Sequence, residues 1–347
     1  MRGVRSLGAR SVEVCDWPDP EPQGDEVVVR VDAASICGSD LHGIYRKKSP
    51  HGVIPGHEGM GEVVAVDSAR RVRVGDRVLI LAIIGCGRCR WCREGDFSLC
   101  EAKRGVLGFD RNGVHAEFSL VPESALLPLP EYVRDEAAAC ILDPVGTTYH
   151  ALKRMSARAD HTVGVFGLGP MGLGGVLVSS FLGAEVIGLD PIAFRREHAE
   201  GLGATHTLDP TSCDAVEAIE DLTRGRGLDM ALECSGNAEA LRQALDSVRP
   251  KGAVSIIGEA AEAVISPSAH FNRKEITLCG STCFPMSDYQ DILNCIQRGL
   301  DASRLITHRF ALEDAVDAYA SFDRGRTGKV TFLRELSTAN TTLEPTP

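Results

Sequence analysis

The chain has 347 residues, of which 44% are hydrophobic and 24% charged, and its formal net charge is −11. This length exceeds what one hydrophobic core organises well, so about two domains are expected. The acidic balance disfavours binding to nucleic acid and to anionic membranes, because both need a basic surface. The sequence has no apolar run near the ~20 residues of a membrane span and no signal-peptide core at its start. A cytoplasmic protein is therefore predicted.

Short β-branched runs, each bounded by Gly, Asp or Pro, fill the N-terminal part of the chain. They cover residues 27–31, 62–66, 77–81 and 114–121. Strands this short and this evenly punctuated are typical of a barrel-like antiparallel domain. A β-rich first domain is therefore predicted over residues 1–146.

Four cysteines stand close together within this domain, in the pattern Cys86-x2-Cys89-x2-Cys92-x7-Cys100. Four thiolates at this spacing suit one tetrahedral Zn2+ without an open coordination position. Such a site cannot admit a substrate, so a structural zinc lobe is predicted over residues 85–101. Two alternatives are disfavoured: a pair of disulfides by the reducing compartment, and a zinc module for nucleic acid by the acidic charge.

Strands alternate with helices from residue 147 to residue 285. The predicted strands cover 162–166, 185–189, 228–233, 253–257 and 275–279, and the predicted helices 170–182, 193–202, 215–223 and 238–248. This alternation indicates a doubly wound parallel sheet, so the fold class is α/β with a Rossmann domain. Residues 286–347 are predicted to return to the first domain through a helix near 287–298 and a strand at 329–332. The polar tail, 337–347, is expected to be loosely ordered.

A G-x-G-x-x-G run, formed by Gly167, Gly169 and Gly172, lies between a predicted strand and a predicted helix. This context is that of a dinucleotide site, in which the first glycine makes a tight turn and the second admits the pyrophosphate. The third glycine allows close packing of helix and strand, and the helix N-terminus faces the phosphates. A glycine-rich turn without a ligand is the alternative.

Asp190 ends the next predicted strand, about 20 residues after the glycine run, where an acid is expected to bind the adenosine ribose. A carboxylate accepts hydrogen bonds from both ribose hydroxyls and repels a 2′-phosphate. The sequence thus predicts NAD(H) rather than NADP(H). Arg195 and Arg196 follow and could weaken this preference, although arginines on a helix surface are common without such a role.

Two further segments contain residues that bind metals. They are Cys37-Gly38-Ser39-Asp40-Leu41-His42 and Gly56-His57-Glu58. Either segment alone could be structural, but with the cysteine lobe and the glycine run they occur in a fixed order. In this order they resemble the zinc-dependent medium-chain alcohol and polyol dehydrogenase family, over about residues 20 to 335. One departure is Asp67, where the family usually has Gly or Ala.

The resemblance implies a GroES-like catalytic domain whose catalytic Zn2+ is held by Cys37, His57 and a third residue shortly before the coenzyme domain. Asp143 is the preferred third ligand because of its offset to His150 in the family, and Cys140 is the competing one. One thiolate and one carboxylate then cancel the charge of Zn2+. The fourth position stays open for water, for the alcohol or, transiently, for Glu58.

The resemblance also implies roles for residues around this zinc. Ser39 bonds the reacting oxygen, His42 passes the proton to solvent, and Asp40 fixes the tautomer of His57. An exposed loop histidine is the alternative for His42. The predicted coenzyme-binding residues are Gly167, Gly169, Pro170, Met171, Gly172, Asp190, Arg195 and Thr147, with Thr148 as an alternative to Thr147.

The predicted function is hydride transfer between NAD(H) and a secondary alcohol or ketone, with two Zn2+ per chain. The Cys-Gly-Ser-Asp-x-His form favours a polyol, a sugar or a related polar alcohol. Residues 45–48 either contact an anionic or hydroxylated substrate or form a solvated loop, and Phe109 belongs either to the pocket or to the core. An amino alcohol such as threonine, a zinc-free reductase and a non-enzymatic family member are alternatives. The resemblance also implies a homodimer or homotetramer.

Overall fold

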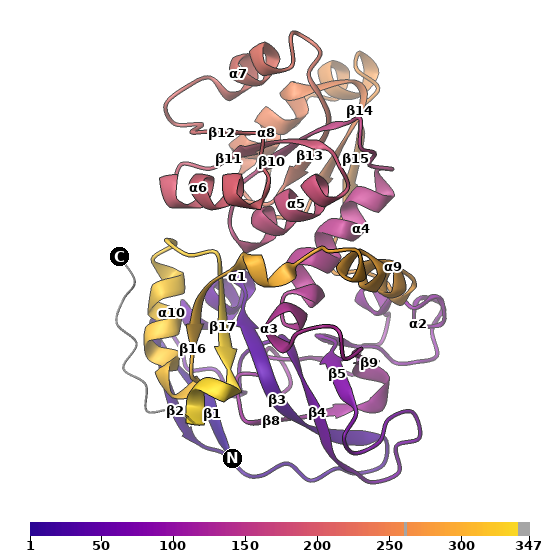
Figure 1. Cartoon of the computed structure of the whole chain (residues 1–347), viewed down its shortest axis with the longest axis vertical. Coiled ribbons are helices and arrows are strands. Elements are labelled where there is room, and N and C mark those ends of the chain that lie inside the picture. Colours follow the sequence, from indigo (N-terminus) through magenta and orange to yellow (C-terminus); the bar gives the residue numbers. More distant parts are fainter. Residues whose placement is uncertain (260–261, 339–347) are drawn as a thin grey trace.

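A computed structural model describes residues 1–259 and 262–338 of the chain. Its two large sheets lie in two lobes, one above the other in Figure 1. The upper lobe is the parallel α/β part and the lower lobe the β-rich part, so the predicted fold class is confirmed. The last nine residues of the predicted tail, 339–347, lie outside the described residues.

The lower lobe is built on a seven-stranded sheet in the order β16-β17-β3-β4-β5-β9, with β8 also pairing with β3. Its strands are β3 (Glu26–Ile36), β4 (Glu58–Val66), β5 (Arg77–Ile80), β8 (Phe118–Pro122), β9 (Leu126–Pro128), β16 (Ile306–Phe310) and β17 (Lys329–Leu333). All pairs are antiparallel except β16 with β17. Alternate residues Val27, Val29 and Val31 of β3 point into one core, as the period of a strand requires.

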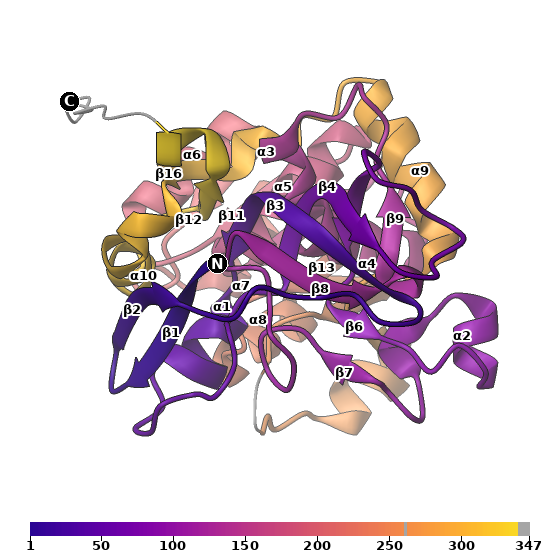
Figure 2. The ribbon, with the colours of Figure 1, turned by 90° about the horizontal axis from the view of Figure 1, so that it is seen from below.

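An N-terminal hairpin of β1 (Arg2–Gly8) and β2 (Ser11–Asp16) packs beside this sheet and was not predicted. Its turn residues Ala9 and Arg10 both have positive φ, 51° and 63°. The smaller elements of the lobe are α1 (Gly38–Asp40), β6 (Ile83–Ile84), α2 (Arg90–Glu94), β7 (Gly105–Val106), α3 (Asp135–Ala138) and α10 (Ala315–Asp323). Figures 1 and 2 both place α2 at the edge of the molecule.

The upper lobe contains a six-stranded parallel sheet in the order β12-β11-β10-β13-β14-β15. The strands are β10 (Thr162–Phe166), β11 (Glu185–Leu189), β12 (His206–Leu208), β13 (Leu228–Glu233), β14 (Val248–Ile256) and β15 (Thr277–Gly280). The helices are α4 (Gly146–Arg154), α5 (Pro170–Phe181), α6 (Ala193–Leu202), α7 (Ala215–Leu222), α8 (Ala238–Ser247) and α9 (Met286–Gln297).

Helices cover both faces of this parallel sheet. Val163 and Val165 of β10 belong to the core that contains α5, whereas the next residue, Phe166, packs in the core that contains α7 and α8. The strand order reverses between β10 and β13, which is where ligands of such sheets bind, outside the carboxyl ends of the strands.

Two single π-helical turns interrupt the regular elements of the lower lobe: η1 (Leu41–Tyr45) and η4 (Ile141–Val145). The other short turns are η2 (Phe97–Leu99), η3 (Glu123–Ala125), η5 (Pro267–Asn272), η6 (Ala302–Leu305), η7 (Leu312–Asp314) and η8 (Arg334–Thr338). Within the described residues, no helix combines the length and apolarity needed to cross a membrane. We propose that the domain boundaries lie at 146/147 and 285/286, since all strands of the parallel sheet fall between them.

Candidate active site and metal centres

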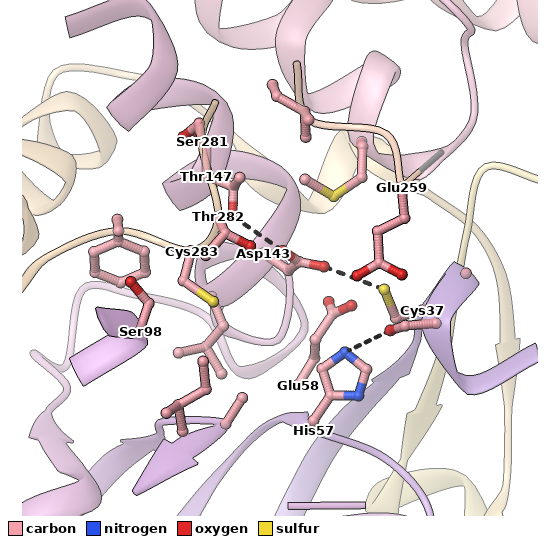
Figure 3. A pocket seen from close by; sticks show the side chains of 18 of the residues that line it. Cys37, His57, Glu58, Ser98, Asp143, Thr147, Glu259, Ser281, Thr282 and Cys283 are labelled. Carbon is pink, nitrogen blue, oxygen red and sulfur yellow. Dashed lines mark hydrogen bonds between the residues drawn. The ribbon is translucent and has the colours of Figure 1, made fainter. Parts of the chain in front are cut away.

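A cavity of about 370 Å³ lies where the two lobes meet. Cys37, His57 and Phe109 of the lower lobe line it together with Met171 and Ile257 of the upper lobe. Figure 3 shows the polar end of this cavity, where Cys37, His57, Glu58 and Asp143 point toward one another. Elements of both lobes therefore contribute side chains to one cavity.

Cys37, His57, Glu58 and Asp143 form the first of two groups of metal-binding side chains in the described chain, with ligand atoms within 4.8 Å of one another. Cys37 follows β3, Glu58 opens β4 directly after His57, and Asp143 lies in η4. Ser35 of β3 pairs with Glu58 of β4, so the antiparallel ladder brings the first two segments together. The structure thus joins the three predicted ligands and adds Glu58.

Asp143 lies together with Cys37 and His57 in this group, whereas its rival Cys140 does not. The thiol of Cys37 donates to Asp143 Oδ2 at 3.2 Å, and the Thr147 hydroxyl donates to Oδ1 at 3.0 Å. Cys140 is fully buried in the core instead, where burial raises the pKa of its thiol to about 12. A π turn containing Pro144 presents Asp143, and such turns often occur at functional sites.

Asp40 holds the ring of His57, as predicted. Its Oδ1 lies 3.2 Å from His57 Nδ1, and its Oδ2 accepts a hydrogen bond from the backbone N–H of Cys37 at 2.9 Å. Burial opposes ionisation of Asp40, but the charge and hydrogen bond of His57 outweigh it and lower the pKa to about 2. The other ring nitrogen, Nε2, lies 3.3 Å from Ser39 Oγ, within hydrogen-bond distance.

Lys329 is a buried partner of Glu58 that the sequence analysis did not identify. Its Nζ lies 2.5 Å from Glu58 Oε1, and both side chains are inaccessible to solvent. The second oxygen, Oε2, is buried without a hydrogen-bond partner among the described residues. Burial raises the pKa of Glu58 to about 7, while the charge of Lys329 acts in the opposite direction. The sequence indicates such a buried cation only by placing a lysine at the start of the mostly apolar strand β17.

This donor set fits a divalent cation of the zinc type. A thiol, an imidazole and carboxylates are the ligands that Zn2+ accepts, and only three of the four groups are needed for an open site. Burial and the charge of Asp143 raise the pKa of Cys37 to about 11, so its thiolate needs a compensating cation. The Oε2 atom of Glu58, buried without a hydrogen-bond partner among the described residues, points to the same requirement for a cation.

The four-cysteine lobe fits a closed zinc site. Cys86 and Cys92 place their sulfur atoms 4.0 Å apart, and Cys89 and Cys100 place theirs 3.9 Å apart. A tetrahedron with Zn–S bonds of about 2.3 Å has edges of about 3.8 Å, close to these values. All twelve cysteines are free, so the disulfide alternative is absent. Backbone N–H groups of Arg88 and Cys89 lower the pKa of Cys86 to about 6, which favours the thiolate ligand.

The glycine run has the local geometry predicted for a dinucleotide site. Gly167 has φ +90°, a conformation that disfavours a side chain. A Cβ at Gly172 would lie 1.8 Å from the carbonyl oxygen of Gly167, so Gly172 cannot carry a side chain either. Gly169, Pro170 and Met171 line the cavity at the start of α5. Space is open around Gly169, as required where the pyrophosphate approaches the backbone.

Asp190 lies beside this run and outside the cavity lining. It is 3% exposed, and its oxygens accept from the backbone N–H of Leu168 at 2.8 Å and of Ile192 at 2.9 Å. Arg195 Nη1 lies 3.4 Å from the Asp190 carboxylate, whereas Arg196 donates to the Asp190 carbonyl oxygen. The carboxylate thus links the end of β11 to the glycine turn.

Ser39, His42 and Thr147 all line the cavity, whereas Thr148 donates to the carbonyl oxygen of Pro144. His42 is exposed, with its Nδ1 3.4 Å from Arg46 Nη1, so it lies at the solvent end. Phe109 lines the cavity too, with its ring centroid 5.5 Å from that of His57.

Of the two interpretations of residues 45–48, the structure favours the solvated loop, since residues 46–48 are exposed. Tyr45 is buried against Tyr319, and Arg46 pairs with Asp323 at 2.6 Å. None of these four residues is part of the cavity lining. Tyr45 and Arg46 contact α10 instead of the metal-binding group.

Comparisons with known proteins agree with this architecture. Residues 23–131 match the alcohol dehydrogenase GroES-like domain, and residues 170–298 match the zinc-binding dehydrogenase family. The chain is 35% identical to an L-threonine 3-dehydrogenase of Pyrococcus abyssi, over 96% of this chain and 97% of that one. It is 32% identical to a sorbitol dehydrogenase of Halalkalibacterium halodurans, over 93% and 96%.

Among solved structures, the chain is similar to the alcohol dehydrogenase TADH from Thermus sp. ATN1. The TM-score is 0.88 at 32% identity, over 96% of this chain and 99% of that one. Family descriptions, relatives and fold agree with the order of the motifs, including the GroES-like part predicted from it. The chain therefore belongs to the zinc-dependent medium-chain alcohol dehydrogenase family, whose members are oxidoreductases acting on small molecules.

Proposed function

We propose that the chain catalyses reversible hydride transfer between NAD(H) and a secondary alcohol or its ketone, in the cavity between the lobes. This proposal rests on the positions of the metal-binding group and of the glycine run, which lie on two sides of one cavity. Cys37, His57 and Asp143 converge on one side of the cavity, and Gly169 to Met171 line the other. A substrate at the first group and a nicotinamide against Met171 would therefore be neighbours.

Cys37, His57 and Asp143 would hold a catalytic Zn2+, and the four-cysteine lobe would hold a structural one. When bound, the catalytic ion supplies Lewis acidity that makes an alcohol hydroxyl easier to deprotonate, and the nicotinamide supplies the hydride chemistry. One thiolate, one carboxylate and a neutral imidazole leave this set without net charge around a divalent ion. Asp40 keeps His57 in the required tautomer from the other ring nitrogen.

Ser39 and His42 supply a route for the proton that the oxidation releases. The C–H bond of the substrate breaks toward the coenzyme, while the hydroxyl proton has to leave a partly closed cavity. Ser39 Oγ, beside His57 Nε2, is placed to accept this proton. His42 lies at the exposed end and can pass it to water, because the pKa of an imidazole lies near neutrality.

Asp190 supports NAD(H) as the coenzyme. Its buried carboxylate lies next to the glycine turn, where a 2′-phosphate would meet a negative charge. Arg195, beside it, would bind the same ribose. Asp190→Ala should therefore improve kcat/KM for NADP relative to NAD by at least about tenfold, and a parent enzyme that already prefers NADP would contradict the coenzyme assignment.

The names of the relatives support a polar secondary alcohol as substrate, since sorbitol and threonine both carry one. They leave open a polyol or sugar on one hand and an amino alcohol on the other. We further propose a cytoplasmic homodimer or homotetramer, with no nucleic-acid or membrane partner, in line with the net charge of −11.

Cys37→Ser tests the catalytic assignment. In the zinc-loaded enzyme it should lower NAD-linked oxidation of a panel of secondary alcohols by at least about 100-fold, with unchanged far-UV circular dichroism. Cys213→Ser is the matched control, because Cys213 is exposed and remote from both cysteine-containing groups. Full activity of Cys37→Ser would contradict the metal assignment, and an inactive parent with both coenzymes would favour a non-enzymatic family member.

A further inference from the structure

Glu259 adds a third carboxylate to the cavity, beyond those of the metal-binding group. It follows β14 and lines the cavity, but its oxygens are not part of the group formed by Cys37, His57, Glu58 and Asp143. In Figure 3 its side chain descends from the upper lobe toward Cys37. It makes no hydrogen bond or ion pair with the other described residues, so its charge is available to a ligand.

The backbone that carries Glu259 is fixed. The N–H groups of Ile257 and Gly258 both donate to the carbonyl oxygen of Glu233, at 2.8 and 2.9 Å. Gly236, with φ +69°, lies so close that a Cβ there would be 2.3 Å from the carbonyl oxygen of Glu259. The backbone directly before Glu259 is therefore held against the end of β13.

The negative charge of Glu259 has no opposite charge beside it in the described part of the cavity lining. Glu58 is paired with Lys329, and Asp143 would share the compensation of a divalent ion with Cys37. Among the described residues, no lysine or arginine lines the cavity. Lys103 is exposed and outside the lining, although its charge slightly opposes the rise in the pKa of Cys283. His42, at the mouth, is the remaining group that can become cationic.

The rest of the substrate end is mostly apolar. Its walls are formed by Leu81, Ile83, Phe97, Phe109, Leu142 and Phe284. Neutral hydroxyls are added by Ser98, Ser281 and Thr282, besides Ser39 and Thr147 near the metal-binding group and Ser235 on the coenzyme side. A polyol would leave several of its hydroxyls without partners there, which is costly in a desolvated site. An amino acid would bring a carboxylate for which the lining offers no lysine or arginine.

We propose that Glu259 is a specificity-determining residue that binds the ammonium group of a cationic amino alcohol lacking a carboxylate. The hydroxyl of such a molecule would reach the metal-binding group, its ammonium would meet Glu259, and its carbon chain would contact the apolar wall. Glu259 is exposed, so the selectivity would come from a charge-assisted hydrogen bond to its unpaired carboxylate. The inference rests on the proposed function, because it names the substrate class of the same cavity.

Four alcohols of similar size test this inference: isopropanolamine, propylene glycol, lactate and sec-butanol. They share a secondary hydroxyl and differ in whether the neighbouring group is cationic, hydroxylated, anionic or apolar. With the zinc-loaded enzyme and NAD, at a pH that keeps the amine protonated, kcat/KM for isopropanolamine should exceed that for propylene glycol by at least about tenfold. Lactate should be the poorest substrate.

Glu259→Gln keeps the shape of the side chain and removes its charge. The preference for the amine should fall to within about threefold of the diol, mainly through a higher KM for the amine, and sec-butanol, which has no cationic group, should lose less activity than the amine. Glu262→Gln is the matched control, because Glu262 is an acid of the same loop that does not line the cavity. An unchanged amine preference in Glu259→Gln overturns the inference, as does an equal loss for all four alcohols caused by weaker binding of NAD.

Direct binding separates this inference from the proposed function. Calorimetric titration of isopropanolamine into the enzyme with zinc and NAD needs no turnover. Tighter binding of the amine to the parent than to Glu259→Gln supports the inference even if none of the four alcohols is oxidised, a result that would count against the proposed function alone. Equal binding to both proteins overturns the inference, whatever the activity.

Discussion

At the scale of single residues, the least expected feature is the ion pair of Lys329 and Glu58, two side chains inaccessible to solvent. Transfer of two charges from water to a protein interior is costly, and their attraction offsets this cost only when the contact is close. Removal of one partner leaves the other charge buried without compensation. The pair therefore fixes Glu58 with one oxygen on Lys329 and the other free toward the metal-binding group.

Lys329→Met should destabilise the protein by about 3–5 kcal/mol, because it leaves Glu58 unpaired in the interior. The measurement is urea unfolding at neutral pH, with zinc present at the same concentration throughout. Adding Glu58→Gln to Lys329→Met should restore part of the loss, since the unpaired charge is then gone. Strict additivity of the two single changes in this double-mutant cycle would show that the pair is not coupled.

Residues in short motifs were predictable one by one, while their partners from distant segments were not. Cys37, His57 and the glycines carry local patterns that indicate chemistry. Glu58 and Lys329 are 271 positions apart, and only the pairing of β17 with β3 and of β3 with β4 brings them together. Glu259 has no motif at all, so only its place in the cavity revealed it.

At the scale of elements, the parallel sheet was predicted closely because its strands are buried runs between recognisable helices. The β1–β2 hairpin was missed for a physical reason. Its two-residue turn uses positive φ at Ala9 and Arg10, although Asn-Gly or Asp-Gly usually marks such a turn. Strand β8 also begins at Phe118, four residues later than the start of the predicted run at 114.

Asp229 connects three elements of the parallel sheet. It lies in β13, is buried, and accepts hydrogen bonds from the Thr162 backbone N–H at 2.8 Å and from Arg249 at 2.7 Å. Arg226 lies 3.1 Å away. Burial opposes ionisation of Asp229, but these donors outweigh it and lower its pKa.

Asp229→Asn should cost about 1.5–3 kcal/mol in the free energy of unfolding at neutral pH, because two charged contacts are lost. The folded pKa lies below the unfolded value of about 3.9, so the contribution is present above that value and disappears as the pH falls through the folded pKa. Urea unfolding at pH 7 and at about pH 3.5 should therefore show a difference that shrinks in acid. The exposed Asp221→Asn should change stability by less than about 0.5 kcal/mol at both, and an equal loss at both pH values for Asp229→Asn would contradict the assignment.

At the scale of the whole molecule, the positions of the two candidate metal sites indicate a catalytic role for one and a structural role for the other. The open group lies between the lobes, whereas the four-cysteine lobe projects at an edge with α2, as Figures 1 and 2 show. The sequence predicted both ligand sets and the two-part architecture. It gave no information on how the lobes meet, because that depends on contacts between segments far apart in the chain.

Cys86→Ser should reduce the zinc content from two ions to one per chain and lower the melting temperature. Turnover per remaining zinc should stay within about threefold of the parent, since the affected site lies outside the cavity lining. Metal analysis by mass spectrometry and a thermal melt measure these effects, with Cys213→Ser as the control. Loss of activity with the other zinc and the fold intact would mean that the two metal roles are reversed.

The central place of β17 also has a consequence for biosynthesis. This strand lies between β16 and β3, and it carries the lysine that neutralises a carboxylate close to residues from the first sixth of the chain. Domains tend to fold as they leave the ribosome, from the N-terminus onward. The sheet of the lower lobe cannot be completed until β17, near the end of the described residues, has been synthesised. A truncated translation product that ends before β17 would carry all predicted zinc ligands and still lack the central strand and the lysine beside Glu58.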